Sequence, residues 1–453
     1  MFENKIIHFI GIGGISMSGI AEILHEKGAI ITGSDASSSK LTNKLENKGI
    51  KIYIGENPNL VEKADIVIYT AAISEENTEL KKARELNKEL YERAKFLGII
   101  TKEYKNVICI SGTHGKSTTT GMVASCFIED KKNPTIQIGA ILPKINSNYL
   151  VGGNDYFILE ACEYVDSFLS FYPTSEIILN IDEDHLNYFG NLENIIKSFH
   201  KFINLLPENG FLAINNDDKN TMSINLPVDK KILTYAIKSD ANVVAKNISY
   251  DDLGYPSFDI YFNNEFYIHI TLKVLGNHNI YNALATTSMC IMHNISKEAI
   301  IKGLNEYVGV ERRFQLVGKT EKNNLVYDDY AHHPTEIETT LNSVKSIKHN
   351  QNWAIFQPHT FSRTKEHMNE FADILKNFDN IIIAPIYAAR EKNIYNIKED
   401  DLVELIKTFN SNVLYIDSFE KIIDFLKENV KSEDLIITIG AGPINEVANK
   451  LIK

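Results

Sequence analysis

One short segment of this chain limits the choice of fold more than any other. Residues 112–117 read Gly-Thr-His-Gly-Lys-Ser, directly after the apolar run 107–110 and before a helix-like stretch at 118–128. A strand, a glycine-rich turn and a helix in that order bind phosphate, because backbone N–H groups and the helix N-terminus attract its oxygens. The lysine can reach terminal phosphates and the serine hydroxyl can bind Mg²⁺. The segment predicts an ATP-binding α/β domain, with a purely structural turn as the alternative.

Strand-like and helix-like segments alternate along most of the 453 residues, which is typical of parallel sheets with helical crossovers. We expect three α/β domains: a Rossmann-like domain at 1–104, a central domain at 105–309 and a second Rossmann-like domain at 310–453. The central domain is expected to be a parallel sheet like that of P-loop ATPases. A small antiparallel addition to it is predicted from the alternating segments 258–262 and 266–270, with Asn263-Asn264 as the turn.

Composition excludes several classes of partner. Lys and Arg number 47 against 59 Asp and Glu, a formal net charge of −12, which disfavours non-specific binding to nucleic acid or anionic membranes. The four cysteines are isolated and show no Cys-x-x-Cys spacing, as in reduced cytosolic proteins. No segment reads as a signal peptide or is long and apolar enough for membrane insertion. We therefore expect a cytoplasmic protein without nucleic-acid or membrane partners.

A second glycine-rich turn, at 11–19, follows the first predicted strand and opens a helix. It resembles a dinucleotide-binding turn but has Ser16 where the third glycine of that motif belongs. Asp35 follows the second strand, where an acidic ribose ligand would lie. We interpret the turn as a phosphate-binding site for a nucleotide other than NAD, and a purely structural turn is the alternative.

Acidic residues and histidines follow two neighbouring predicted strands of the central domain. Glu160 ends the run 156–159, and Asp182, Asp184 and His185 follow the run 177–181. Open α/β sheets bind ligands at these strand ends. A carboxylate and a histidine there could hold a second Mg²⁺ near the γ-phosphate. Each residue alone is more often a solvated loop group.

Four further segments carry polar side chains that could face a nucleotide. His278 and Asn282 lie four residues apart on one face of a predicted helix, suited to adenine or ribose, although a simple helix cap is equally compatible. Segment 311–315 contains Arg313, which could contact phosphates or form a hinge ion pair. Segments 328–336 and 357–363 follow predicted strands and concentrate acids, histidines and an arginine, so we expect both to face one cleft.

In this order the motifs resemble the Mur ligases, the amino-acid ligases of peptidoglycan synthesis, over essentially the whole chain. The loop 112–117 has that family's short form, and the motifs at 11–19, 312–314 and 328–334 are similar to those of its alanine-adding branch. The resemblance implies an ATP- and Mg²⁺-dependent ligase that joins L-alanine to UDP-N-acetylmuramate through an acyl phosphate, giving ADP and phosphate. It also implies a cytoplasmic monomer or homodimer.

The resemblance assigns roles to individual positions of this sequence. The catalytic residues it implies are Lys116, His332 and Arg313. The ATP-binding residues are Gly112, Thr113, His114, Gly115, Lys116, Ser117, Thr118, His278, Asn282, Arg313 and Asp329. The substrate-binding residues are Gly11, Gly13, Gly14, Ser16, Met17, Ser18, Asp35, Thr70, His185, Tyr330, His332, His359 and Arg363. The metal ligands are Ser117, Glu160 and His185.

Two alternatives remain open at this point. A ligase that reattaches a recycled tripeptide to the same UDP-sugar shares several of these motifs. A nucleotide-binding protein without chemistry is the alternative from another class. The acids and histidines at several strand ends favour an enzyme, because binding ATP alone needs only the loop and Mg²⁺.

Overall fold

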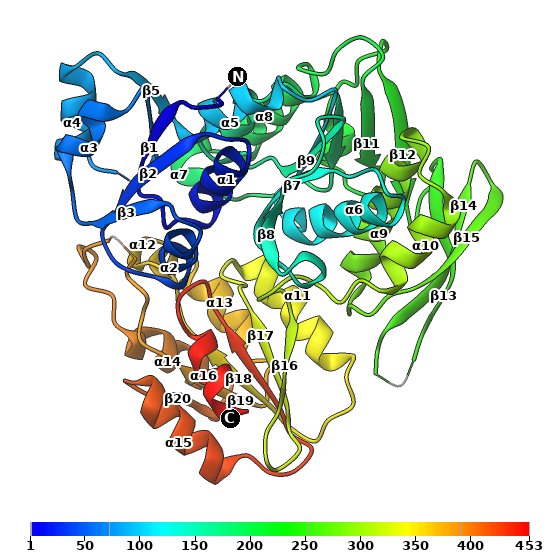
Figure 1. The fold of residues 1–453 in the computed structure, drawn as a ribbon. Helices are drawn as coiled ribbons and strands as arrows, with labels where there is room; N and C mark the ends of the chain where they lie inside the picture. Colours follow the sequence, from blue (N-terminus) through cyan, green and yellow to red (C-terminus); the bar gives the residue numbers. More distant parts are fainter. Residues whose placement is uncertain (1, 72, 252, 390, 453) are drawn as a thin grey trace. The chain divides into compact units, whose positions relative to one another are not determined.

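The computed structural model describes residues 2–71, 73–251, 253–389 and 391–452. The chain forms two compact units (Figure 1). The first comprises Met1–Ile248, Phe258–Thr271 and Ile280–Val308, and the second comprises Ser249–Ser257, Leu272–Asn279 and Gly309–Lys453. The first unit holds two sheets and the second holds one. The predicted α/β fold class is confirmed, and the structure builds it from three sheets.

The N-terminal sheet of the first unit is parallel, with strand order β3-β2-β1-β4-β5. Its strands are β1 (Ile6–Ile10), β2 (Ile30–Asp35), β3 (Lys51–Ile54), β4 (Ile66–Tyr69) and β5 (Glu89–Glu92). Its helices are α1 (Ile15–Glu26), α2 (Lys40–Asn47), α3 (Pro58–Lys63), α4 (Thr78–Glu85) and α5 (Arg93–Thr101). The strand order reverses between β1 and β4, so ligands are expected at the carboxyl ends of these strands.

The second sheet of this unit has the order β15-β14-β13-β12-β11-β10-β6-β9-β7-β8. Its strands are β6 (Asn106–Ser111), β7 (Thr135–Leu142), β8 (Ser147–Leu150), β9 (Tyr156–Glu160), β10 (Ser175–Ile178), β11 (Phe211–Asn215), β12 (Lys231–Ala236), β13 (Val243–Tyr250), β14 (Pro256–Phe262) and β15 (Glu265–Thr271). The α-helices of this region are α6 (Lys116–Glu129), α7 (Leu186–Phe189), α8 (Leu192–Ile203), α9 (Asn277–Met292) and α10 (Lys297–Asn305). The 3₁₀ helices are η1 (Pro143–Ile145), η2 (Tyr164–Ser170) and η3 (Thr221–Ser223).

The sheet of the second unit has the order β16-β17-β21-β18-β19-β20 and is parallel apart from the β16–β17 pair. Its strands are β16 (Gln315–Lys319), β17 (Leu325–Asp329), β18 (Asn352–Phe356), β19 (Asn380–Ile383), β20 (Val413–Tyr415) and β21 (Leu435–Ile439). Its helices are α11 (Pro334–Lys345), α12 (Phe361–Glu366), α13 (Met368–Leu375), α14 (Glu399–Lys407), α15 (Phe419–Asn429) and α16 (Asn445–Leu451).

Local sequence explains where two of these elements turn or end. Asn263 and Asn264 have φ of 49° and 68°, which is the turn that a two-residue hairpin requires, so the predicted β14–β15 hairpin is confirmed. The strand predicted at 177–181 is wrong at its end, because β10 stops at Ile178. The backbone and side chain of Asn180 bind the phosphate loop instead of a neighbouring strand.

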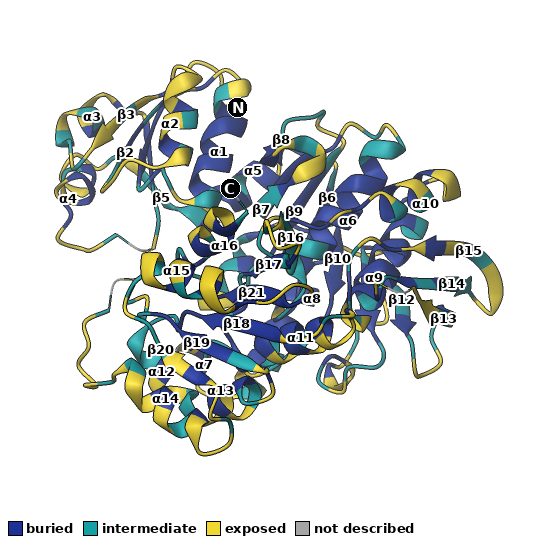
Figure 2. Cartoon of the chain, turned by 90° about the horizontal axis from the view of Figure 1, so that it is seen from below, coloured by how far each residue is buried: buried dark blue, intermediate teal, exposed yellow. Residues whose placement is uncertain are grey.

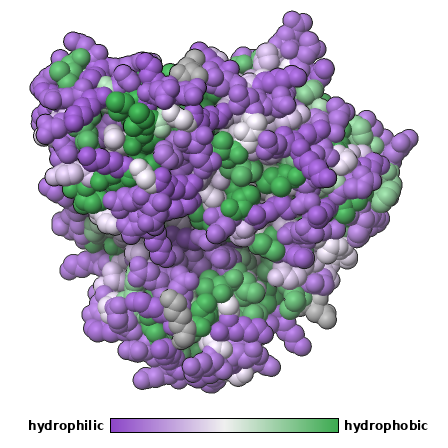
Figure 3. Space-filling view, in the orientation of Figure 1, coloured by the Kyte–Doolittle hydropathy of each residue, from purple (hydrophilic) through white to green (hydrophobic). Residues whose placement is uncertain are grey.

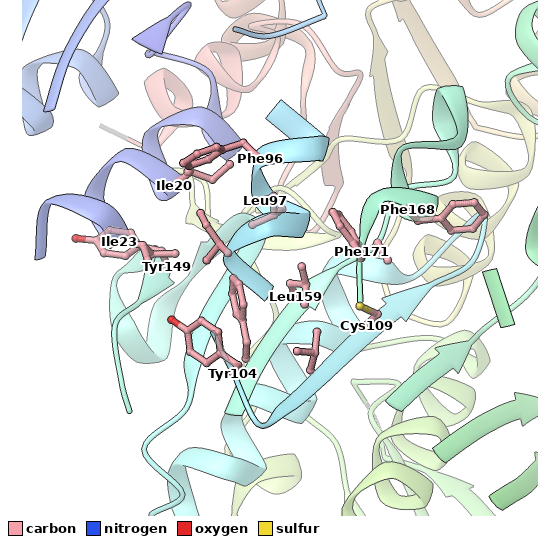
Figure 4. Close-up of a cluster of buried hydrophobic side chains, with 14 of the residues drawn as sticks. Ile20, Ile23, Phe96, Leu97, Tyr104, Cys109, Tyr149, Leu159, Phe168 and Phe171 are labelled. Carbon is pink, nitrogen blue, oxygen red and sulfur yellow. The ribbon is translucent and has the colours of Figure 1, made fainter. Parts of the chain in front are cut away.

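The two sheets of the first unit share one hydrophobic core. Figure 4 shows Ile20 and Ile23 of α1, Phe96 and Leu97 of α5, and Leu159 of β9 within it. Each buried aliphatic or aromatic side chain of this size contributes about 1.5–3 kcal/mol. The N-terminal sheet is therefore attached to the central sheet by ordinary core packing.

Hydrogen bonds add specificity to this contact. Nε2 of Gln137 on β7 donates to Oγ of Ser16 at 2.7 Å, and Nδ2 of Asn148 on β8 donates to the carbonyl of Ile15 at 2.6 Å. Both acceptors lie at the start of α1. The glycine-rich turn before this helix is therefore fixed relative to the central sheet.

Burial follows the sheets, as Figure 2 shows for their inner strands. Strands β6, β9 and β21 are nearly continuous apolar runs, as expected for parallel strands covered on both faces. The face seen in Figure 3 is mainly hydrophilic. Among the helices of the described residues, none is long and apolar enough to cross a membrane.

Candidate active site

The phosphate-loop segment lies between β6 and α6, where the sequence predicts it. Gly112 and Gly115 have φ of 143° and 88°, conformations that L residues with side chains rarely adopt. A Cβ on Gly115 would lie 2.9 Å from Oδ1 of Asn282, and one on Gly112 would lie 2.8 Å from Cβ of Leu179. The loop therefore requires glycine at both positions. Helix α6 begins directly after it at Lys116, so its first backbone N–H groups are available to an anion.

The segment that follows β10 anchors this loop. The backbone N–H groups of Thr113 and His114 donate to the carbonyl and to Oδ1 of Asn180, at 3.0 and 2.8 Å. The backbone N–H of Asp182 donates to Oγ1 of Thr113 at 2.9 Å, and its carboxylate lies 3.5 Å from Nε2 of His114. Asp182, which the sequence analysis considered for metal binding, is thus placed to position the loop.

Lys116 has a partner that the sequence analysis missed. Its Nζ donates to the carbonyls of Gly112 and Thr113 at 2.6 and 3.0 Å and lies 3.0 and 3.2 Å from the two carboxylate oxygens of Glu163. Burial favours the neutral amine, but the Glu163 carboxylate outweighs it, so the pKa of Lys116 is raised. The lysine is an ammonium ion at neutral pH, as phosphate binding requires.

The predicted metal ligands come from three elements of the first unit. Ser117 lies in the first turn of α6 and is buried, and Glu160 ends β9. Oε1 of Glu160 accepts the backbone N–H of Gly139 at 2.7 Å. His185 has φ of 55°, and its ring packs against that of Tyr164 in a tilted arrangement with the centroids 4.4 Å apart. This contact restricts the imidazole orientation, as a ligand position needs.

These residues fit Mg²⁺ as a partial ligand set. A carboxylate and a hydroxyl supply the hard oxygen ligands that Mg²⁺ prefers. Within the described parts of the chain there is no cluster of three or more His, Cys, Asp or Glu arranged to hold a metal. Mg²⁺ commonly binds to one or two protein groups and completes its shell with substrate phosphates and water. Ser117, Glu160 and His185 suit that mode better than a closed protein cage.

Two predicted ATP-binding residues lie on α9. His278 is exposed, whereas Asn282 is buried with its amide oxygen beside Gly115 of the phosphate loop. Asn282 therefore lies beside the loop that is predicted to bind the phosphates of ATP, and not only near a predicted adenine position. Thr118 is another predicted ATP-binding residue. Its backbone carbonyl accepts a hydrogen bond from the hydroxyl of Tyr307 at 3.1 Å.

The N-terminal turn lies at the carboxyl ends of β1, β2 and β4. Oδ2 of Asp35 accepts the backbone N–H of Gly13 at 2.8 Å, and a Cβ on Gly13 would meet that same oxygen. Gly11 has φ of 83°, and Thr70 closes over it so tightly that a Cβ there would lie 2.7 Å from Cγ2. Gly14 caps α1 without a side chain. Asp35 thus holds the turn in shape besides being a predicted substrate ligand.

A cavity of about 400 Å³ opens beside this turn. Gly11, Ser34 and Asp35 line one part of it, and Asn77 and Glu79 line another. Its size and its place at the strand-order reversal are those of a ligand site in an open α/β sheet. A cavity therefore lies beside the turn that is predicted to bind the sugar nucleotide.

The predicted contacts at the start of α1 divide into two groups. Ser16 is half-buried. Its hydroxyl oxygen accepts hydrogen bonds from Nε2 of Gln137 at 2.7 Å and from Nη1 of Arg93 at 3.2 Å. Met17 belongs to the shared core, and the buried Ser18 donates to the carbonyl of Ile15. The structure gives Met17 and Ser18 packing roles, while Ser16 faces the more polar surroundings.

The adjacent arginines of the second unit have different environments. Arg312 donates Nε to Asp328 at 3.0 Å and Nη2 to the carbonyls of Gly440 and Gly442 at 2.6 and 3.0 Å. Arg313 lies 3.5 Å from Glu336 and its side chain is about one-third exposed. Arg312 therefore connects loops of the second unit, whereas the more exposed Arg313 stays a predicted ligand contact.

Asp329 ends β17, and Tyr330 and His332 follow it directly. Oδ2 of Asp329 accepts the hydroxyl of Thr340 at 2.6 Å, and burial raises the pKa of Asp329 to about 6. Nδ1 of His332 lies 2.9 Å from the carbonyl of Tyr330, which can only accept, so Nδ1 carries the proton and Nε2 carries the lone pair. Burial, partly opposed by Glu336, lowers the pKa of His332.

His359 and Arg363 come from the segment after β18 and the start of α12. The rings of His359 and His332 lie 5.6 Å apart, and Nη1 of Arg363 donates to Nδ1 of His359 at 3.2 Å. Burial, with help from His332 and Arg363, lowers the pKa of His359 to about 4. Thr360 between them has φ of 64°, a strained conformation for a residue with a side chain. The structure thus brings segments 328–336 and 357–363 together, and the cleft that both are expected to face stays a prediction.

Three families match successive parts of the chain. Residues 6–105 match the family described as "Mur ligase family, catalytic domain", residues 110–290 match "Mur ligase middle domain", and residues 312–442 match "Mur ligase, glutamate ligase domain". Together these matches extend over most of the sequence.

Curated relatives are similar over almost their whole length. A UDP-N-acetylmuramate–L-alanine ligase of Caldanaerobacter subterraneus is 46% identical over 449 residues, covering 99% of this chain and 97% of the relative. The protein of that name from Clostridium novyi is 46% identical over 451 residues, covering 100% and 98%.

Solved structures have the same fold. The UDP-N-acetylmuramate–alanine ligase of Thermotoga maritima aligns with a TM-score of 0.85 at 26% identity and covers 99% of this chain and 98% of its own. A murein peptide ligase of Psychrobacter arcticus aligns with a TM-score of 0.73 at 23% identity over 99% and 98%, a likeness of fold alone.

Proposed function

This chain belongs to the Mur ligase family, and from that premise we propose that it joins L-alanine to the lactoyl carboxylate of UDP-N-acetylmuramate with conversion of ATP to ADP and phosphate. The observation that carries the proposal is the 46% identity, over whole chains, to relatives that bear this reaction in their name. The structural likeness to the Thermotoga maritima ligase supports it. The reaction would belong to cytoplasmic peptidoglycan precursor synthesis.

We assign ATP to the phosphate loop and the first turn of α6, with Lys116 on the terminal phosphates. The glycine conformations at 112 and 115 and the ammonium of Lys116 support this assignment. Ser117, Glu160 and His185 would hold Mg²⁺. When bound, Mg²⁺ would neutralise charge on the terminal phosphates. The sugar nucleotide is assigned to the N-terminal turn and the cavity beside Asp35.

A carboxylate must be activated before an amine can displace its oxygen, because oxide is a very poor leaving group. A lactoyl carboxylate oxygen attacks the γ-phosphorus of ATP, the bond from that phosphorus to the β–γ bridging oxygen breaks, and ADP leaves. The alanine amine then attacks the carbonyl carbon of the acyl phosphate. The C–O bond to the phosphate breaks, inorganic phosphate leaves, and an amide is formed. Lys116 stabilises the negative charge of the transferred group.

His332 is suited to accept the proton from the alanine ammonium. Its Nδ1–H is held by the Tyr330 carbonyl, so Nε2 presents a lone pair. Its lowered pKa keeps it neutral near pH 7, and a neutral imidazole is the form that acts as a base. Arg363, beside His359, supplies a guanidinium that can bind the alanine carboxylate.

Phosphate release by the purified full chain tests the proposal. ATP, Mg²⁺ and UDP-N-acetylmuramate are supplied with L-alanine, with the tripeptide, or with no acceptor, and the products are identified by mass. We expect phosphate release that depends on L-alanine, with a product heavier by one alanyl residue. Release with the tripeptide alone would reassign the chain to the recycling reaction. Absence of release with both acceptors would refute the ligase proposal.

A further inference from the structure

The ammonium of Lys116 is surrounded by protein acceptors. It has two carbonyls of the loop, Gly112 and Thr113, and both oxygens of the Glu163 carboxylate within 3.2 Å. An ammonium has three N–H groups, so these four acceptors satisfy it completely. The proposed role of Lys116 is to bind terminal phosphates, which would need the same N–H groups.

Glu163 is held close to Lys116 by its surroundings. Its side chain is only 2% exposed, and that of Lys116 is 18% exposed. A buried carboxylate needs a positive partner, because its transfer from water is otherwise very unfavourable. Glu163 and Lys116 therefore stabilise each other as a buried ion pair.

The backbone around Glu163 leaves its carboxylate available for this pairing. Glu163 precedes η2 at the cap position, yet its side chain makes no capping hydrogen bond. Val165 and Asp166, two and three residues further on, have φ of 49° and 56°, so the turn is strained. The carboxylate therefore pairs with Lys116 and does not cap its own helix.

We propose that Glu163 is the counter-ion that Lys116 exchanges for nucleotide phosphate, so that the carboxylate and the phosphates compete for one ammonium. This inference rests on the proposed assignment of ATP to the phosphate loop. Two negative groups cannot share the ammonium without repulsion in a site of low dielectric constant. Glu163 therefore holds the lysine in place before nucleotide binds and lowers the affinity for nucleotide.

Replacing the Glu163 carboxylate by an uncharged amide tests whether Glu163 competes with nucleotide phosphate for Lys116. We expect Glu163→Gln to bind ADP and ATP more tightly, on the order of tenfold, since close charge pairs have couplings of at least that size. In a Lys116→Met background the same change should have no effect on nucleotide affinity. Glu193→Gln is the matched control, because Glu193 pairs with Lys197 on the exposed face of α8.

Calorimetric titration of the full chain measures these affinities, with EDTA in one series and Mg²⁺ in another. Tighter binding by Glu163→Gln in both series supports the counter-ion role. Unchanged or weaker binding in both series overturns it, and weaker binding only with Mg²⁺ overturns it in favour of metal coordination. If Glu163→Gln does not fold, Glu163→Asp is titrated instead. Its shorter side chain should give a smaller gain in affinity, and no gain would overturn the proposal.

The Lys116→Met single variant tests the counter-ion role of Glu163 separately from the proposed binding of ATP to the phosphate loop. If Lys116→Met leaves nucleotide affinity unchanged, the assignment of ATP to the loop fails. If Lys116→Met weakens binding while Glu163→Gln fails to tighten it, only the counter-ion role fails.

Discussion

Glu176 in the middle of the central sheet should make the protein less stable as the pH rises. It lies on β10, opposite Cys109 of β6 and Leu212 of β11, and is completely buried. Among the described residues its two carboxylate oxygens have no hydrogen-bond partner. Burial raises its pKa well above the ordinary value of 4.5, and the charge of Lys230 opposes this only in part.

The direction of this change in stability follows from how many protons the folded and unfolded states bind. The folded state keeps the proton on Glu176 at pH values where the unfolded chain has lost it, so stability is fully present below pH 4.5 and falls as pH rises toward the folded-state pKa. One proton corresponds to a slope of about 1.4 kcal/mol per pH unit. Between pH 5.5 and 7.5 the wild type should therefore lose up to about 2.7 kcal/mol relative to Glu176→Gln.

Denaturant unfolding of both proteins at pH 5.5, 6.5 and 7.5 measures this difference. Other titrating groups are the same in both chains, so they cancel in the comparison. Glu208→Gln at an exposed position serves as the control and should show no pH-dependent difference from the wild type. A stability difference between Glu176→Gln and wild type that stays constant over this pH range would refute the reasoning, because it would mean that Glu176 is ionised in the folded protein.

Four further substitutions test the packing and the site. Gly98→Ala should destabilise the first unit by about 3 kcal/mol in denaturant unfolding, because its Cβ would lie 1.9 Å from the carbonyl oxygen of Ser170; wild-type stability would contradict this. His332→Gln should lower kcat by about 10²–10⁴-fold and remove the acidic limb of the pH–rate profile, and an unchanged profile would exclude it as the base. Arg312→Lys should lower the melting temperature through an approximately 2 kcal/mol loss of hydrogen bonding, whereas Arg313→Lys should lower kcat with little change in melting temperature. The reverse pattern would show that the two arginines have been assigned the wrong roles.

The sequence predicted the strand ends that carry polar groups, because an apolar run followed by glycine, acids or histidines is a local pattern. The loop at 112–117 and the meeting of segments 328–336 and 357–363 both follow from such patterns. The same reasoning could not separate Arg312 from Arg313. Their difference comes from Gly440 and Gly442, more than a hundred residues away in the chain.

Glu163 was missed for a similar reason. In the sequence it is one acid among several after β9, and only the folded chain places its carboxylate beside Lys116. Met17 and Ser18 show a different limit, since a motif near a glycine-rich turn predicts ligand contact but says nothing of packing. The structure uses both for packing against neighbouring elements, which residue type alone does not reveal.

The core shared by the two sheets of the first unit has a consequence for synthesis on the ribosome. The first sheet leaves the ribosome before β7, β8 and η2 have been made, so the parts of α1 and α5 that pack against these elements are uncovered at that stage. At about 5–20 residues per second, that interval lasts several seconds. During it, the uncovered apolar side chains of these two helices are open to chaperones or to other nascent chains. A stalled chain that ends near residue 104 should therefore be prone to aggregation, although all the strands of its own sheet are present.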